Sequence, residues 1–286
     1  MKSMDKYELK RGGFRIVLLV ALETLKTRLL KAMFFPIIFT LSLIDIVIGT
    51  LAYYLMAIFV EGGMNRYISA YGITYPEYLL VAIIGDILAG LFLYSFYEAI
   101  GMGYWGCETD LYITSPVGLK GMIMGSLLTS LVWNTLAVFT LLSFAAILGI
   151  PLHLENLPQV LEVLAIGLLP FLGLGLISAS TFTLMNAKQG SPITWAINIA
   201  QRILSGYYFP VQLLPGFIRP LSYILPHTYF YEALRLAVSK GIWLHSYYHL
   251  LHPLLIQIAI LLPLGVVLFK YSLIKAEKTG DLSRWT

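Results

Sequence analysis

Six long stretches of mostly apolar residues most strongly constrain what this chain can fold into. A helix that crosses the hydrocarbon core of a membrane needs about 20 consecutive, predominantly apolar residues. We place the predicted transmembrane helices at 33–60, 79–103, 120–149, 160–186, 193–208 and 250–271. The sequence therefore predicts an all-α, polytopic membrane protein, organised as a single transmembrane domain over 1–286.

The composition excludes a soluble enzyme. Hydrophobic residues make up 58% of the 286 residues and charged residues only 12%, whereas about a quarter of an ordinary soluble domain is charged. The single cysteine, Cys107, excludes a disulfide framework and a thiolate metal cage. The net charge of +4 does not indicate a nucleic-acid partner, because basic residues of a membrane protein mainly set its orientation.

An amphipathic helix is predicted over 14–32, before the first span. Its apolar side includes Leu18, Ala21, Leu22, Leu25 and Leu29, and its charged side Arg15, Glu23, Lys26 and Lys31. A helix of this kind lies in the plane of the membrane surface and does not cross it. A secretory signal is the alternative, but no small-residue cleavage site precedes the first span.

The distribution of lysine and arginine predicts the orientation. With six spans and the amino terminus inside, the predicted outer segments hold only Arg66, Arg219, Arg235 and Lys240, and nearly all other basic residues lie inside. This asymmetry follows the positive-inside rule. We therefore expect a multi-pass protein of the cell membrane with both termini in the cytoplasm.

The predicted outer segment 209–249 is too aromatic to be an ordinary solvated loop. Four prolines divide it: Pro210, Pro215, Pro220 and Pro226. Tyrosine and tryptophan are favoured at headgroup depth, and irregular backbone at membrane depth must be buried in protein. We expect two short helices that dip into the outer leaflet and return.

Ionisable residues inside the predicted spans are the main candidates for a transport pathway or gate. Asp45 lies in the first span, Asp86 and Glu98 in the second, and Arg202 in the fifth. Each costs about 2.5–3.5 kcal/mol on insertion scales unless it is paired or hydrated. Two interpretations stay open: these groups line a pathway together with Asn198 and Gln201, or Arg202 pairs with an acid and the amides bond between helices.

Three histidines, His245, His249 and His252, recur at helical spacing near the start of the last span. One helix face could bring them together as zinc ligands, or they could be ordinary interfacial residues. An intramembrane enzyme acting on lipid would use this cluster as its centre. The sequence contains no phosphate-binding loop and none of the common membrane-enzyme motifs, so we predict no catalytic residues and no ATP site in this chain.

Two segments together carry a family resemblance. The inner loop 104–117 contains Glu108, Thr109, Asp110, Leu111, Thr114 and Pro116; the outer segment contains Ser205, Gly206, Pro210, Leu214, Pro215, Pro226, Glu232 and Arg235. Acidic residues favour a helix amino terminus and proline ends a helix. With its length, its span count and the initial amphipathic helix, the chain resembles the permease subunits of type 2 ABC transporters, mostly exporters.

The resemblance implies a role for each segment. In that family an acidic residue and a short helix of the first inner loop dock onto a separate ATPase subunit, which here assigns Glu108 and the residues up to Pro116. Family members often have glycine where this chain has Thr109. The outer motif marks re-entrant helices, on which Glu232 and Arg235, three residues apart, are expected to pair.

The resemblance also implies the function and the partners. The expected protein is a non-enzymatic permease that works as a homodimer or with a homologous permease, bound to two ATPase subunits that hold ATP and Mg²⁺. Its expected cargo is amphipathic, lipid-like or drug-like. The alternative is an ion-coupled secondary transporter that uses Asp45, Asp86 and Glu98, although no inverted repeat is visible in the sequence.

Overall fold

The computed structural model describes residues 9–107, 109 and 119–282, and these form helices joined by short connections. No β-strand occurs in this part of the chain. The α-helices are α1 (Leu9–Phe34), α2 (Pro36–Ile68), α3 (Tyr75–Trp105), α5 (Leu119–Ile147), α6 (Leu157–Gly167), α7 (Leu169–Leu184), α8 (Pro192–Leu204), α9 (Arg219–Ser222), α10 (Pro226–Lys240) and α11 (Tyr248–Thr279). Four 3-10 turns are η1 (Ser69–Tyr71), η2 (Leu154–Asn156), η3 (Val211–Leu213) and η4 (Leu244–Ser246).

Five helical segments of the described residues are long and apolar enough to cross a membrane. They are Thr40–Tyr71, Tyr75–Trp105, Leu119–Ile147, Leu154–Leu184 and Tyr248–Ala276. These segments overlap the first four predicted spans and the last one. The prediction of a helical, membrane-embedded protein that crosses the bilayer several times is therefore confirmed.

The predicted fifth span, 193–208, corresponds to α8, which is shorter than expected. Ser191 begins α8, because its side chain accepts a hydrogen bond from the Thr194 backbone N–H at 3.3 Å, and Pro192 follows at the first position. Gly206, with φ +81°, turns the chain away soon after Leu204. The 13 residues of α8 give a rise of about 20 Å, less than the roughly 30 Å thickness of a hydrocarbon core.

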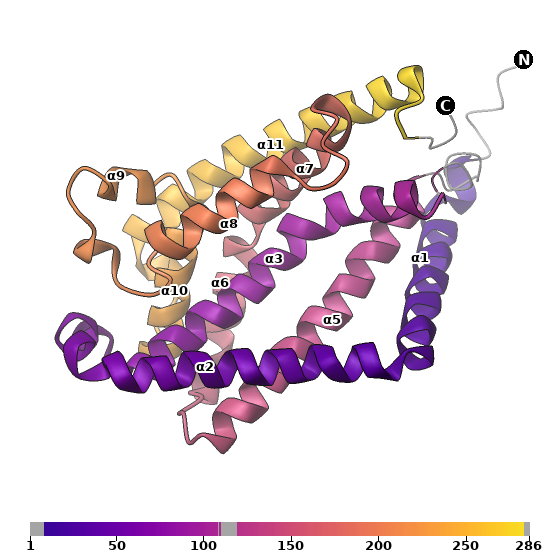
Figure 1. Ribbon diagram of the computed structural model, residues 1–286. Helices are drawn as coiled ribbons and strands as arrows, with labels where there is room; N and C mark the ends of the chain where they lie inside the picture. The colour runs from indigo at the N-terminus through magenta and orange to yellow at the C-terminus, as the bar shows by residue number, and fades with distance from the viewer. Residues whose placement is uncertain (1–8, 108, 110–118, 283–286) are drawn as a thin grey trace, which may run out of the picture.

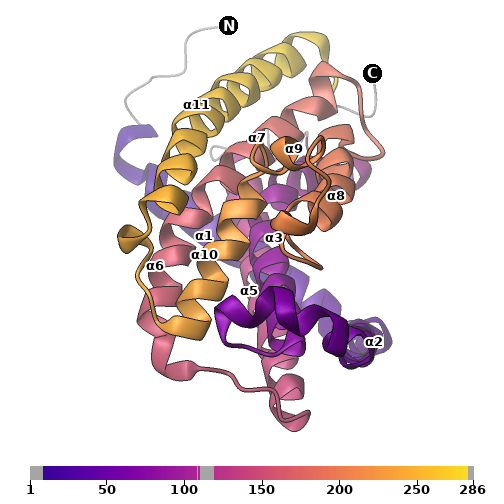
Figure 2. The same ribbon diagram turned by 90° about the vertical axis from the view of Figure 1, so that its left-hand side faces the viewer.

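Helix α3 occupies the centre of the arrangement, with α5 and α7 on either side and α2 and α10 against its first half (Figure 1). Thr74 and Glu77 start α3 with a capping box, in which each side chain bonds the backbone N–H of the other. The main apolar core lies where α3, α7 and α10 meet, around Tyr78, Phe171 and Tyr231. Figure 2 views α2 along its length and shows it at the edge of the bundle.

Helix α7 packs closely on both of its neighbours through glycines. A Cβ atom at Gly175 would lie 2.0 Å from the Phe92 carbonyl oxygen of α3, and a Cβ atom at Gly173 would lie 2.5 Å from the Leu261 carbonyl carbon of α11. Only residues without a side chain permit these backbone approaches. The two glycines therefore fix the spacing of the α3, α7 and α11 layer.

The predicted amphipathic segment 14–32 is helical and lies within α1, which runs across one end of α5 (Figure 1). Thr24 of α1 sits against Gly125 of α5, where a Cβ atom would lie only 2.6 Å from the threonine Cβ. Ala21 is fully buried, whereas Leu18 and Leu22 remain exposed. Gly125 therefore allows α1 to pack closely against α5.

The segment 209–249 forms η3, α9, α10 and η4 at the end of the molecule opposite α1 (Figure 1). Pro226 occupies the first turn of α10, which ends at Gly241 with φ +61°. Of the two short helices that the prolines predicted, α9 has only 4 residues and α10 has 15. The rest is irregular backbone and 3-10 turns, of which η4 contacts α6 and α11.

Candidate functional site

Asp86, one of the two acids predicted in the second span, joins a hydrogen-bond network between three helices. Gln201 of α8 donates from Nε2 to Asp86 Oδ1 at 3.0 Å. The Tyr231 hydroxyl of α10 lies 2.6 Å from Gln201 Oε1 and 3.4 Å from the same Asp86 oxygen. Gln201 and Tyr231 are buried. The network therefore holds a carboxyl group in place inside the bundle.

A polar cavity of about 360 Å³ lies beside this network, between α3 and α5. It is lined by Asp86, Gly90, Tyr94, Glu98, Ser130 and Asn134, among others. The two carboxylates predicted in the second span thus face one cavity. Asn134 donates from Nδ2 to the Ser130 carbonyl at 2.7 Å and so remains within its own helix. A cavity with these groups can hold water or a polar part of a ligand at membrane depth.

The remaining intramembrane candidates differ in their position relative to this cavity. Asn198 of α8 accepts a hydrogen bond from the Tyr94 hydroxyl. Arg202 is exposed on α8 and directly follows Gln201, which donates a hydrogen bond to Asp86. Asp45 is exposed on α2, and the part of the chain that the structure describes offers it no salt-bridge partner. The structure therefore connects Asp86, Glu98, Asn198 and Gln201 into one region and leaves Asp45 outside it.

Arg235 of α10 is the most deeply buried charged side chain of the outer segment. It is 1% exposed, and its Nη2 donates to the carbonyls of Gly206 at 2.7 Å and Tyr207 at 3.3 Å. Its Nε donates to the Tyr78 carbonyl at 3.4 Å. Gly206 of the predicted outer motif thus contacts a buried arginine, and the preceding residue Ser205 donates a hydrogen bond from Oγ to the Gln201 carbonyl.

The predicted pairing of Glu232 with Arg235 is wrong. Glu232 instead accepts a hydrogen bond from the Tyr71 hydroxyl at 2.6 Å, while Arg235 binds backbone carbonyls. The three-residue spacing allowed an ion pair on one helix face, but both side chains instead bind groups on other segments of the chain. Tyr71 follows α2, so Glu232 ties α10 to the connection between α2 and α3.

The other residues of the outer motif shape the turns. Pro210 precedes η3, and Leu214 behind it is buried. The Pro215 carbonyl accepts hydrogen bonds from the backbone of Ile218 and Arg219, both at 3.0 Å. Pro226 begins α10.

His227, which the motif analysis did not single out, follows Pro226 and is 1% exposed against Phe171 and Tyr231. Burial lowers the pKa of His227 to about 3. Its imidazole is therefore neutral at physiological pH and belongs to the core where α7 and α10 meet.

His245 lies in η4, and His249 and His252 lie in the first turns of α11. His245 Nδ1 lies 2.7 Å from Glu162 Oε1 of α6, and His252 packs against Tyr248. No group of three His, Cys, Asp or Glu side chains in the described ranges is placed to hold a metal ion. The sequence did not suggest Glu162 as a partner of these histidines, because it precedes His245 by 83 residues.

Most of the proposed ATPase-docking loop lies outside the described residues. This applies to Glu108, Asp110, Leu111, Thr114 and Pro116. Thr109 is described and is 2% exposed, and a Cβ atom at Gly103 of α3 would lie 2.9 Å from its hydroxyl oxygen. Thr109 therefore packs against the end of α3.

Tyr94, Ser130 and Tyr231 are site residues that the sequence analysis missed. A signal was present for two of them, because Asp86, Tyr94 and Glu98 recur at four- and eight-residue spacing and Ser130 precedes Asn134 by four. No sequence signal brings Tyr231 to Asp86. A comparison of the chain with protein-family models and with curated proteins finds no match.

Proposed function

We propose that this chain is the permease subunit of an ATP-driven transporter of the type 2 ABC class. The observation that carries the proposal is the polar cavity between two membrane-spanning helices, lined by Asp86 and Glu98, in a chain without a phosphate-binding loop. Carboxylates at membrane depth are costly and are retained where a pathway needs them. ATP and Mg²⁺ bind to a separate ATPase subunit.

The proposed topology has six crossings, with α8 and the backbone around Gly206 together forming the fifth. The end of the molecule that holds α1 is cytoplasmic, and the end with α10 is outside. Lys26, Lys188 and Lys275 belong to the cytoplasmic end, as the positive-inside rule requires. In this orientation α1 lies in the inner membrane surface, and the loop with Glu108 faces the ATPase.

A second copy of the chain completes the pathway. The outward side of α2 carries Asp45, and the outward side of α8 carries Arg202; both are exposed. Lipid covers exposed apolar residues of the same helices, such as Phe59 and Trp195, without cost, but it does not solvate a charge. A homologous surface packed against α2 and α8 shields both charged groups from lipid, so that two copies together bound the pathway.

The proposed cycle is mechanical. ATP closes the two ATPase subunits, the segment near Glu108 transmits the movement to α3 and α5, and the cavity between these helices changes its access from the inside to the outside. Export of an amphipathic, lipid-like or drug-like molecule fits a cavity that combines carboxylates with apolar walls. The cargo's polar group contacts Asp86 or Glu98, and its apolar part contacts the spans.

Copurification tests the proposal. The tagged chain is crosslinked in its own membranes, extracted in mild detergent and examined by mass spectrometry, with Glu108→Lys and the matched control Glu155→Lys compared with the wild type. We expect the wild type and Glu155→Lys to retain a stoichiometric ATPase that bears a phosphate loop, and Glu108→Lys to lose it. Recovery of all three proteins without an ATPase refutes the assignment.

An ion-coupled secondary transporter is the second candidate, because Asp86 and Glu98 face the same cavity and could carry protons. The two mechanisms differ in their energy source. Transport that continues after ATP depletion and stops with an uncoupler supports proton coupling. Transport that stops with ATP depletion in the presence of an intact proton gradient supports the ABC assignment.

A further inference from the structure

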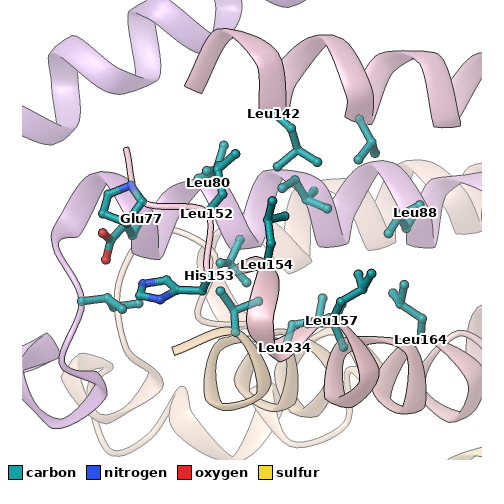
Figure 3. A pocket seen from close by; sticks show the side chains of 17 residues that line it. Glu77, Leu80, Leu88, Leu142, Leu152, His153, Leu154, Leu157, Leu164 and Leu234 are labelled. Atoms are coloured by element: carbon teal, nitrogen blue, oxygen red, sulfur yellow. The ribbon is translucent and has the colours of Figure 1, made fainter. Parts of the chain in front are cut away.

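A second cavity, apolar and with no lining residue in common with the polar one, lies nearer the start of α3. Its volume is about 200 Å³, and its walls come from α3, α5, α6, α10 and the connection at 151–154. Nearly all of the lining side chains are aliphatic, including Leu80, Leu142, Leu164 and Leu234 (Figure 3). The cavity has too few polar partners to hold ordered water.

The polar groups of this cavity gather at one end. Glu77 and His153 lie together at that end in Figure 3, and Leu88 and Leu164 lie at the other. Leu88 follows Glu77 by 11 residues of α3, a rise of about 16 Å. Half of a hydrocarbon core of roughly 30 Å is about 15 Å. The cavity therefore has the length and the polarity of one lipid leaflet, with its polar end toward α10 and η2.

The cavity opens toward the bilayer. Leu154 and Leu157, which belong to its lining, are 66% and 52% exposed. The surrounding helices α3, α5 and α6–α7 belong to membrane-spanning segments, so the medium that reaches this opening is lipid. Because the interior cannot stay hydrated, a hydrocarbon chain fills it better than any polar molecule.

The polar end is acidic. Glu77 accepts a hydrogen bond from the Thr74 backbone N–H at 3.0 Å, and Glu155 lies 3.3 Å from His153 Nδ1. No lysine or arginine lines the described cavity. A headgroup with an ammonium group is attracted by these carboxylates, whereas a purely anionic headgroup is repelled.

We propose that the groove between α3, α5, α6 and α10 binds one hydrocarbon chain of a lipid with an ammonium headgroup, from the leaflet on the α10 side. The lipid chain contacts Leu80 of α3, Leu142 of α5, Leu164 of α6 and Leu234 of α10 at once, and so joins four helices. Because Leu234 precedes Arg235, the bound lipid also supports the position of the buried arginine. This site depends on membrane insertion alone and not on the transport mechanism.

Photocrosslinking tests the site in the full chain. The protein is reconstituted into phosphatidylcholine vesicles that contain a small fraction of phosphatidylcholine with a diazirine midway along one acyl chain. After irradiation, mass spectrometry locates the labelled peptides. We expect labelling of the groove residues to exceed that of the exposed α11 residue Ile256 by about fivefold, which corresponds to a preference of about 1 kcal/mol.

A pair of neighbouring substitutions provides the control. Val160→Trp fills the groove from α6, whereas Leu161→Trp, at the next residue, lies on the exposed face of the same helix outside the groove. Val160→Trp should lower groove labelling about fivefold, and Leu161→Trp should leave it unchanged. If Val160→Trp does not elute as a folded protein in gel filtration, Leu142→Trp fills the same groove from α5.

Several outcomes overturn the proposal. Equal labelling of the groove and of Ile256, or equal effects of Val160→Trp and Leu161→Trp, means that the groove contacts only bulk lipid. If Ile256 is labelled and the groove residues are not, another protein surface covers the groove and no lipid binds there. Competition gives the headgroup: unlabelled phosphatidylethanolamine should displace the probe better than phosphatidylglycerol, and the reverse order refutes the ammonium preference.

Discussion

The guanidinium carbon of Arg235 lies 3.6 Å from the centre of the Tyr78 ring. The same guanidinium donates to the Gly206 carbonyl, which also accepts a hydrogen bond from the Tyr78 hydroxyl at 2.9 Å. Cation–π stacking and hydrogen bonds to carbonyls at the end of α8 therefore compensate for the burial of a charge. Together, Tyr78 and Arg235 hold α3, α10 and the turn after α8 in one arrangement.

Replacing Arg235 by methionine should destabilise the protein. Methionine retains most of the apolar volume but leaves the Tyr207 carbonyl without its guanidinium donor and removes the stacking on Tyr78, a loss of about 3 kcal/mol. The midpoint of thermal unfolding in detergent measures the change. Arg66→Met is the control, because Arg66 lies over Tyr67 at 4.4 Å but is exposed. Equal midpoints for the two variants contradict the structural role of Arg235.

The sequence was sufficient to predict most of the helices but not the contacts between them. Spans such as α3 and α11 can be predicted because each is a single continuous run of apolar residues. The ends of α8 depend on Ser191 and on the positive φ of Gly206, so the span predicted over 193–208 was too long. The contact of Asp86 with Tyr231 joins residues that are 145 apart in sequence, and local spacing cannot predict it.

A polar cavity at membrane depth should be accessible to water. In a Cys107→Ser background, Ser130→Cys faces the cavity and Leu131→Cys, the next residue of α5, faces outward. Thiols react as thiolates, which form in water and not in lipid. We expect a membrane-impermeant methanethiosulfonate to modify Ser130→Cys about tenfold faster, since a thiolate is strongly disfavoured in lipid. Equal rates mean that lipid or protein fills the cavity.

Gly175→Ala should separate α3 from α7. The added methyl group meets the Phe92 carbonyl oxygen at 2.0 Å, and backbone cannot rotate away as a side chain can. Overpacking of this kind costs about 1–3 kcal/mol, so the thermal midpoint in detergent should fall.

Gly49→Ala is the control, because a Cβ atom there meets nothing within 4 Å. Its helix should gain stability by about 0.5–1 kcal/mol. A Gly175→Ala variant as stable as the wild type rules out the close approach.

The buried imidazole of His227 should make stability depend on pH. Burial lowers its pKa to about 3 in the folded state, whereas the ordinary value of about 6.5 applies after unfolding. Above pH 6.5 both states are neutral and this group has no effect. As the pH falls below 6.5, only the unfolded state takes up a proton, so the free energy of unfolding decreases by about 2 kcal/mol at pH 5.

Thermal unfolding in detergent at pH 7.5 and pH 5 measures this loss in the wild type. His227→Phe should reduce the loss, and His252→Phe, at an exposed position on α11, should retain it. Equal losses in both variants mean that carboxylates or the other histidines cause the pH dependence.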